Sequence, residues 1–149
     1  MSPDAPSDWP RESEPLATLP AAAPLPATAS EARGQVVAVL QARADHCGTA
    51  VGERALADIL LVVSELLTNA LRHGGGVTRF EVGARAEEIR VTVGDRSTDL
   101  PRRRTVDQQR ARAGGEGGYG WPLVHQLATG ITITLERDGK LITVTLPLR

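Results

Sequence analysis

Several residue types that often indicate a protein's function are scarce in this chain. Its 149 residues include one cysteine, Cys47, and one lysine, Lys140, and aromatic residues make up only 3%. A single cysteine excludes an internal disulfide bond and any zinc site built on several cysteines. No apolar run approaches the roughly 20 residues that cross a bilayer, so we expect no interaction with a membrane.

The chain also lacks an excess of charge of one sign. It has 17 basic and 18 acidic residues, which gives a net charge of −1. This balance argues against direct nucleic-acid binding through many phosphate contacts. Residues 1–11 do not combine a basic start with an apolar stretch, so a secretory signal is not predicted. We therefore expect a cytoplasmic protein.

Proline is plentiful only near the N-terminus, where it recurs from Pro3 to Pro26. Because proline removes a backbone donor, we predict a Pro/Ala-rich disordered tail over residues 1–29. Residues 16–19 could form a short strand within this tail, confined to the edge of a sheet by the prolines on either side. The compact domain is then predicted over residues 30–149.

Apolar periodicity in the rest of the chain predicts an α+β fold. Helical spacing is found in residues 30–47, with Ser30 as the N-cap, and again in residues 52–72. Alternation with a period of two predicts strands near residues 78–82, 89–93, 131–135 and 141–146. A short helix with Pro122 in its first turn precedes the last two strands. We predict a two-layer α/β sandwich, with helices on one face of a mixed, mostly antiparallel sheet.

The second predicted helix carries a polar pair, Glu65 and Asn69, which are four residues apart and so share one face. We expect this face to lie opposite the apolar stripe, and such a pair is usually part of a solvated surface. The alternative is a site, because an asparagine oxygen suits a hard cation such as Mg²⁺. A glutamate one turn away can then polarise a water or hydroxyl beside the cation.

Asp95 follows the apolar run Val91–Val93 and one glycine, which places it at the end of a predicted strand. The ordinary interpretation of this pattern is a capped turn. A carboxylate at a strand end can also accept a hydrogen bond from the exocyclic amine of a purine.

Glycine is concentrated in residues 114–120, directly before the short predicted helix. Such a segment can be a flexible linker. At a helix N-terminus it can instead offer backbone N–H groups and the positive end of the helix dipole to an anion. The segment lacks the Gly-Lys-Ser/Thr ending of a P-loop, and it does not directly follow a strand as a dinucleotide fingerprint does.

Taken together and in this order, these motifs resemble those of the Bergerat-fold ATP-binding superfamily. Residues 65–73, ELLTNALRH, resemble its N-box, Asp95 to Ser97 stand at its first glycine box, and residues 118–124, GYGWPLV, resemble its second. The resemblance spans about residues 31–148. The short chain and the form of the N-box are similar to the branch of anti-sigma-factor serine kinases and their stand-alone bacterial relatives.

The resemblance implies ATP and Mg²⁺ as cofactors and a role for each motif. Asn69 is expected to bind the Mg²⁺ that bridges the phosphates, Glu65 to act as general base, and Asp95 to bind the adenine amino group. The other nucleotide-binding positions are expected to be Arg72, His73, Ser97, Gly118, Tyr119, Gly120, Trp121 and Leu123. The arginine-rich segment 96–117 is expected to form a lid over the nucleotide, the alternative being an exposed loop.

Two features depart from the superfamily pattern. Ser97 stands where the first glycine box usually has glycine, and the second box contains the bulky Tyr119 and Trp121. These departures bear on the affinity of the site for nucleotide more than on its location.

The resemblance implies a regulator that transfers the γ-phosphate of ATP to a serine or threonine of a protein partner. The expected partner is an antagonist of the anti-anti-sigma type, a sigma factor that the chain sequesters, or both. Relatives in this branch often form homodimers, so a homodimer is compatible with the resemblance. Two alternatives are a non-catalytic protein-binding module with weak or no nucleotide binding, and an unrelated α+β domain with coincidental motifs.

Overall fold

A computed structural model of the protein describes residues 14–101 and 120–149. The elements follow the order β1 (Ala17–Thr18), α1 (Ala29–Cys47), α2 (Glu53–Arg72), β2 (Val77–Ala84), β3 (Glu88–Asp95), α4 (Gly120–Leu127), β4 (Gly130–Glu136) and β5 (Gly139–Pro147). Within these two ranges, no helix has the length and apolar character needed to cross a membrane.

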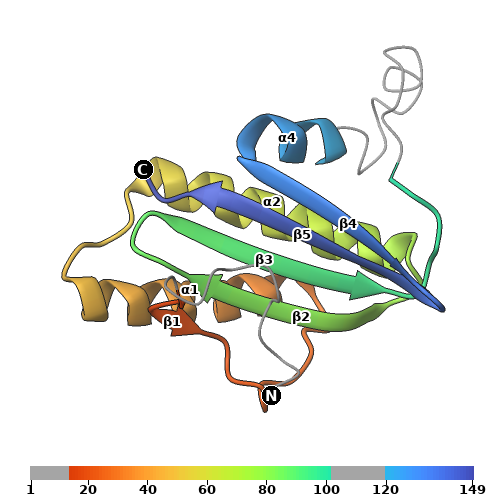
Figure 1. Ribbon diagram of the computed structural model, residues 1–149, viewed down its shortest axis with the longest axis horizontal. Helices are drawn as coiled ribbons and strands as arrows, with labels where there is room; N and C mark the ends of the chain where they lie inside the picture. Colours follow the sequence, from red (N-terminus) through yellow and green to blue (C-terminus); the bar gives the residue numbers. More distant parts are fainter. Residues whose placement is uncertain (1–13, 102–119) are drawn as a thin grey trace.

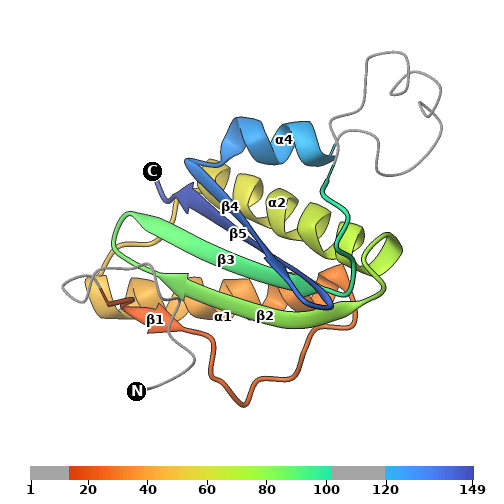
Figure 2. The same cartoon turned by 45° about the vertical axis from the view of Figure 1, so that its right-hand side comes forward.

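The strands form one five-stranded sheet in the order β1-β2-β3-β5-β4. Every pairing among the described strands is antiparallel, so the sheet has no parallel part there. Figures 1 and 2 show α1 and α2 side by side against one face of the sheet, with α4 beside α2. This arrangement confirms the predicted α+β class and two-layer sandwich.

The hydrophobic core lies between this face of the sheet and the helices. The central strand β3 turns Ile89, Val91 and Val93 toward the helices, and each is at most 3% exposed. Helix α2 contributes a stripe of buried side chains at three- and four-residue steps: Ile59, Val62, Val63, Leu66, Leu67 and Ala70. Leu71, four residues after Leu67, is by contrast 41% exposed. The core holds α2 and β3 in fixed positions, and both carry candidate site residues.

Helix α1 begins earlier than predicted. Its N-cap is Thr28 rather than Ser30, because the Thr28 hydroxyl accepts a hydrogen bond from the Glu31 N–H at 3.1 Å. The Glu31 carboxylate in turn accepts from the Ala27 N–H at 2.7 Å, close to a capping-box arrangement. The prediction of Ser30 was wrong because it weighed one residue and not the Thr-x-x-Glu spacing.

Part of the segment predicted as a tail is built into the sheet. Strand β1 pairs with the end of β2, where the Leu16 and Leu19 N–H groups donate to the carbonyls of Ala84 and Val82, each at 2.9 Å. Pro26 is buried as well. Residues 1–13 lie outside the described residues.

A buried arginine, Arg43, lies near the C-terminal end of α1. Arg43 is 4% exposed and donates to the carbonyl oxygens of Thr49 at 2.7 Å, Arg85 at 3.1 Å, and Ala86. It therefore ties the end of α1 to the turn between β2 and β3.

Candidate functional site

Three segments that are distant in sequence meet at Asp95: the end of β3, the residues after α2, and the turn between β4 and β5. A Cβ atom at Gly74 would lie 2.6 Å from the Asp95 Cβ. A Cβ atom at Gly139, the first residue of β5, would overlap the Asp95 carbonyl oxygen. Both positions therefore need glycine, because the chain passes so close to Asp95.

Backbone hydrogen bonds through Gly74 connect the end of α2 to the end of β3. The Asn69 carbonyl accepts from the N–H groups of His73 at 2.9 Å and Gly74 at 3.1 Å. The Gly74 carbonyl then accepts from the Arg96 N–H at 2.7 Å. The N-box helix and the strand-end carboxylate are thus joined by one buried glycine.

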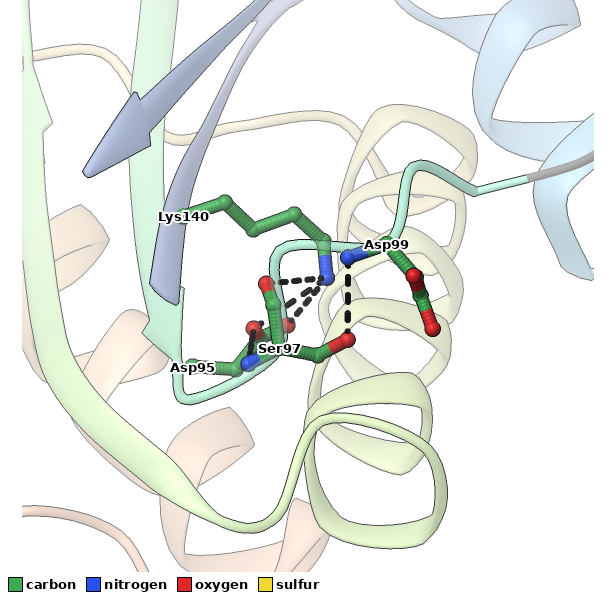
Figure 3. A network of polar contacts seen from close by, with 4 residues as sticks. All are labelled: Asp95, Ser97, Asp99 and Lys140. Atoms are coloured by element: carbon green, nitrogen blue, oxygen red, sulfur yellow. Dashed lines mark hydrogen bonds and ion pairs between the residues drawn. The ribbon is translucent and has the colours of Figure 1, made fainter. Parts of the chain in front are cut away.

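Asp95 forms a buried ion pair with Lys140, and the two residues are 7% and 5% exposed. The Lys140 Nζ lies 3.1 Å from Asp95 Oδ1 and 3.0 Å from Oδ2. It also donates to the Ser97 carbonyl oxygen at 3.2 Å, as Figure 3 shows. The register of the sheet explains this meeting, because Asp95 on β3 stands directly opposite Lys140 on β5.

Ser97 completes the turn that follows Asp95. Its N–H donates to Asp95 Oδ1 at 2.8 Å, and its hydroxyl accepts from the Asp99 N–H at 3.1 Å. No non-glycine residue in the described ranges has a positive φ, so the backbone at Ser97 does not require glycine. The departure from the glycine-box pattern at this position is therefore compatible with the turn.

Glu65 and Asn69 are half-buried along the edge of the α2 stripe, rather than opposite it as predicted. Neither side chain forms a hydrogen bond or ion pair with another described residue. Arg72 and His73 follow at the C-terminal end of the helix, and both are exposed. The polar face of the N-box is thus accessible and lies close to Asp95 through Gly74.

Helix α4 places its first residues against the core. Trp121 is 8% exposed and belongs to the core cluster, with its ring edge-to-face to His125 at 4.9 Å between centroids. Leu123 is half-buried on the same helix, which begins at Gly120 and contacts α2. Gly118, Tyr119 and most of the predicted lid lie outside the described residues.

The residues that sequence reasoning missed are Lys140, Gly74 and Gly139. No role was predicted for Lys140 from the sequence. It is nevertheless the only lysine among 17 basic residues, which could have singled it out. The two glycines stand next to motifs, but the close approach that requires them depends on tertiary structure.

At the end of the site expected to bind Mg²⁺, the half-buried amide of Asn69 is the side chain that would hold the cation. The described residues contain no group of three or more His, Cys, Asp or Glu side chains suited to a metal ion. The resemblance does not require one, because Asn69 and the phosphates would share the cation. At the end of the site expected to bind adenine, the Asp95 carboxylate already accepts one hydrogen bond from the Ser97 N–H. Both of its oxygens also contact the Lys140 ammonium. A carboxylate has about four acceptor sites, so capacity for one more donor remains.

Comparison with known protein families shows which family the chain belongs to. The sequence profile described as the histidine kinase-like ATPase domain matches residues 25–146. The chain therefore belongs to the histidine kinase-like ATPase domain family. This finding confirms the superfamily predicted from the N-box and does not distinguish the anti-sigma-factor branch within it.

Solved structures that are similar to the chain include a blue-light activated histidine kinase from Erythrobacter litoralis EL346. The identity to that chain is 28%, with a TM-score of 0.46, over 66% of this chain and 32% of the other. The separate histidine kinase domain of that protein gives 24% identity and a TM-score of 0.47, over 78% of this chain and 60% of the other. This chain thus spans only part of either protein. A comparison with curated proteins finds no match.

Proposed function

We propose that this chain is an ATP-binding regulatory protein similar to the anti-sigma-factor serine/threonine kinases, acting in the cytoplasm. It transfers the γ-phosphate of ATP to a serine or threonine of an anti-anti-sigma-type partner, sequesters a sigma factor, or does both. The observation that carries the proposal is the set of backbone hydrogen bonds through Gly74, which brings the end of the N-box helix close to Asp95. The chain also belongs to the histidine kinase-like ATPase family.

Each end of the site has a proposed task. When bound, Mg-ATP supplies the phosphoryl group that is transferred. The Asn69 amide oxygen would hold the cation. The half-buried Glu65 carboxylate would accept the proton of the partner's hydroxyl as that oxygen bonds to the γ-phosphorus and ADP leaves. The remaining acceptor capacity of Asp95 would be used by the adenine amino group. Arg72, His73 and the start of α4 at Gly120 supply positive charge and N–H groups for the phosphates.

The binding step is tested by thermal unfolding with and without Mg-ATP. Nucleotide at 100 times its Kd stabilises the folded state by about 2.7 kcal/mol. For a domain of this size we expect the Tm to rise on the order of 5–15 °C. The rise should require Mg²⁺ and should be lost in Asn69→Ala. Gln41→Ala, which removes an exposed amide from α1, is the matched control and should keep the full rise. No rise at millimolar ATP in the wild type would contradict nucleotide binding.

The transfer step is tested with γ-labelled ATP and a candidate anti-anti-sigma-type partner. Glu65→Gln should abolish labelling of the partner and keep the Mg-ATP shift, because the amide cannot take the hydroxyl proton. Glu53→Gln, an exposed change in the first turn of the same helix, should label the partner at the wild-type rate. Phosphoryl transfer by Glu65→Gln at the wild-type rate would exclude Glu65 as the general base.

A second candidate function is a non-catalytic protein-binding module. It is favoured by one observation, the ion pair with Lys140, which satisfies much of Asp95 without a ligand. This function predicts no Mg-ATP shift and no labelling, together with partner binding that is unchanged in both Asn69→Ala and Glu65→Gln.

A further inference from the structure

The proposed function gives no task to Lys140, the buried partner of Asp95. The Lys140 ammonium has three protons and three acceptors within reach: both Asp95 oxygens and the Ser97 carbonyl. Figure 3 shows the ammonium between the Asp95 carboxylate and the loop at Ser97. All donors of Lys140 are therefore engaged within the protein, and none is left for a ligand.

The register of the sheet fixes this ion pair. Asp95 and Lys140 are direct cross-strand neighbours at the last register position of the β3–β5 ladder. A Cβ atom at Gly139 would overlap the Asp95 carbonyl oxygen, so the start of β5 lies directly against the end of β3. The hydrogen bond to the Ser97 carbonyl also ties the ammonium to the turn after Asp95. Lys140 is therefore a built-in partner of Asp95.

The ammonium allows Asp95 to stay ionised although it is buried. The Asp95 side chain is 7% exposed, and a carboxylate in such a place takes up a proton rather than remain charged without a counterion. Lys140 is the one cation within ion-pair distance of Asp95 among the described residues. The Ser97 N–H, at 2.8 Å from Oδ1, is a further donor to the carboxylate. Both neighbours of the carboxyl oxygens thus suit the ionised form.

The charge state of Asp95 decides which purines it can bind. An ionised carboxylate only accepts hydrogen bonds. A purine with an amine at C6 offers it a donor, whereas a carbonyl at C6 sets a second acceptor against it and is repelled. A protonated carboxyl group loses this distinction, because its O–H can donate to the carbonyl. Selection at C6 therefore requires that Asp95 stay ionised.

We propose that Lys140 is a specificity-determining residue, which keeps Asp95 an acceptor-only carboxylate and thereby excludes purine nucleotides with a carbonyl at C6. Lys140 acts through Asp95, because all three of its own donors are engaged. This inference rests on the proposed nucleotide binding.

The first measurement compares the Kd of Mg-ATP with that of Mg-ITP, in which a carbonyl replaces the adenine amine. Calorimetric titration of the wild-type protein should give a Kd for ITP that is higher by about tenfold or more, because the site loses one hydrogen bond and gains a repulsion. Equal Kd values would overturn the inference, and this measurement requires no variant.

Lys140→Met removes the ammonium and keeps an unbranched side chain of similar length. Asp95 should then take up a proton, so we expect the preference for ATP over ITP to fall by about tenfold. A lysine with only a structural role would weaken the binding of both nucleotides together and leave the ratio of the two Kd values unchanged. That result in folded Lys140→Met would also overturn the inference.

Two further variants control for this result. Arg137→Met removes an exposed cation from the β4–β5 turn and should keep the wild-type ratio. Lys140→Met combined with Asp95→Asn replaces the pair by neutral side chains, and the amide offers both a donor and an acceptor. This double variant should show the same low preference as Lys140→Met, and it serves as the test if Lys140→Met alone does not fold. A wild-type preference in the double variant would show that the charge of Asp95 is not the source of selection.

The failure of each proposal has its own signature. If neither triphosphate binds the wild-type protein, nucleotide binding and the role of Lys140 are both overturned. If ATP and ITP bind the wild-type protein equally well, nucleotide binding stands and only selection through Lys140 is wrong.

Discussion

Two buried cations close opposite ends of the sheet, and they are satisfied in different ways. Arg43 donates to carbonyls of the β2–β3 turn, and Lys140 follows the β4–β5 turn; the two residues are 4% and 5% exposed. Figure 1 shows these two turns at opposite ends of the sheet. The planar guanidinium of Arg43 spreads its donors over three backbone carbonyls. The compact ammonium of Lys140 instead sits against both oxygens of one carboxylate.

This difference separates a structural end of the sheet from the end that carries the proposed site. Arg43 has no acidic partner among the described residues, and none of its acceptors belongs to a motif. Lys140 forms an ion pair with Asp95, the residue that the family resemblance assigns to binding the adenine of ATP. Equal burial therefore does not mean an equal role, and substitutions can separate the two.

The largest effect is expected at the ion pair. Lys140→Met leaves a buried carboxylate without its counterion, which we expect to cost about 3–5 kcal/mol of unfolding free energy. Adding Asp95→Asn removes the uncompensated charge and should recover most of that loss, because a neutral replacement of a buried pair is often harmless. Urea denaturation of both variants measures the recovery. A double variant as unstable as Lys140→Met would show that charge is not the reason for the pairing.

Arg43→Met should cost about 1–3 kcal/mol, which is the cost of leaving a buried polar group unsatisfied. Three carbonyls lose their donor, but Thr49 and Ala86 are exposed, so water can replace the guanidinium there. Adding Asp95→Asn should give no recovery here, which is the sharpest contrast with Lys140. The Mg-ATP shift in Tm should stay at its wild-type value. A change in that shift would mean that the two ends of the sheet are coupled.

Much of the fold could be predicted because its signals are local. Alternation along β3 and the stripe of α2 depend on neighbouring residues, and so does the i,i+4 pair of Glu65 and Asn69. The ion pair joins residues 45 positions apart and depends on the register of β3 against β5. No local pattern gives that register, which is why Asp95 was predicted as a site residue and Lys140 was not.

The glycine that joins α2 to Asp95 gives an intermediate effect. Gly74→Ala places a Cβ within 2.6 Å of the Asp95 side chain, and we expect a loss of about 1–3 kcal/mol with displacement of the carboxylate. Gly34→Ala is the matched control, because Gly34 lies inside α1 with nothing within 4 Å of an added Cβ. That change should stabilise the protein by about 0.5–1 kcal/mol. Thermal unfolding measures both, and equal effects would contradict close packing at Asp95.

The smallest effect is expected at a more exposed ion pair, which shows why burial matters. Arg85 and Glu88 pair at 2.9 Å beside the carbonyls that hold Arg43, but their side chains are 31% and 32% exposed. Glu88→Gln removes one charge, as Asp95→Asn does, yet we expect it to cost only about 0.2–1 kcal/mol. The Arg85 guanidinium reaches water when its partner is lost, whereas the Lys140 ammonium stays enclosed. Urea denaturation of Glu88→Gln and of the single variant Asp95→Asn compares them directly. If Glu88→Gln were the more damaging change, enclosure would not explain why Lys140 depends on Asp95.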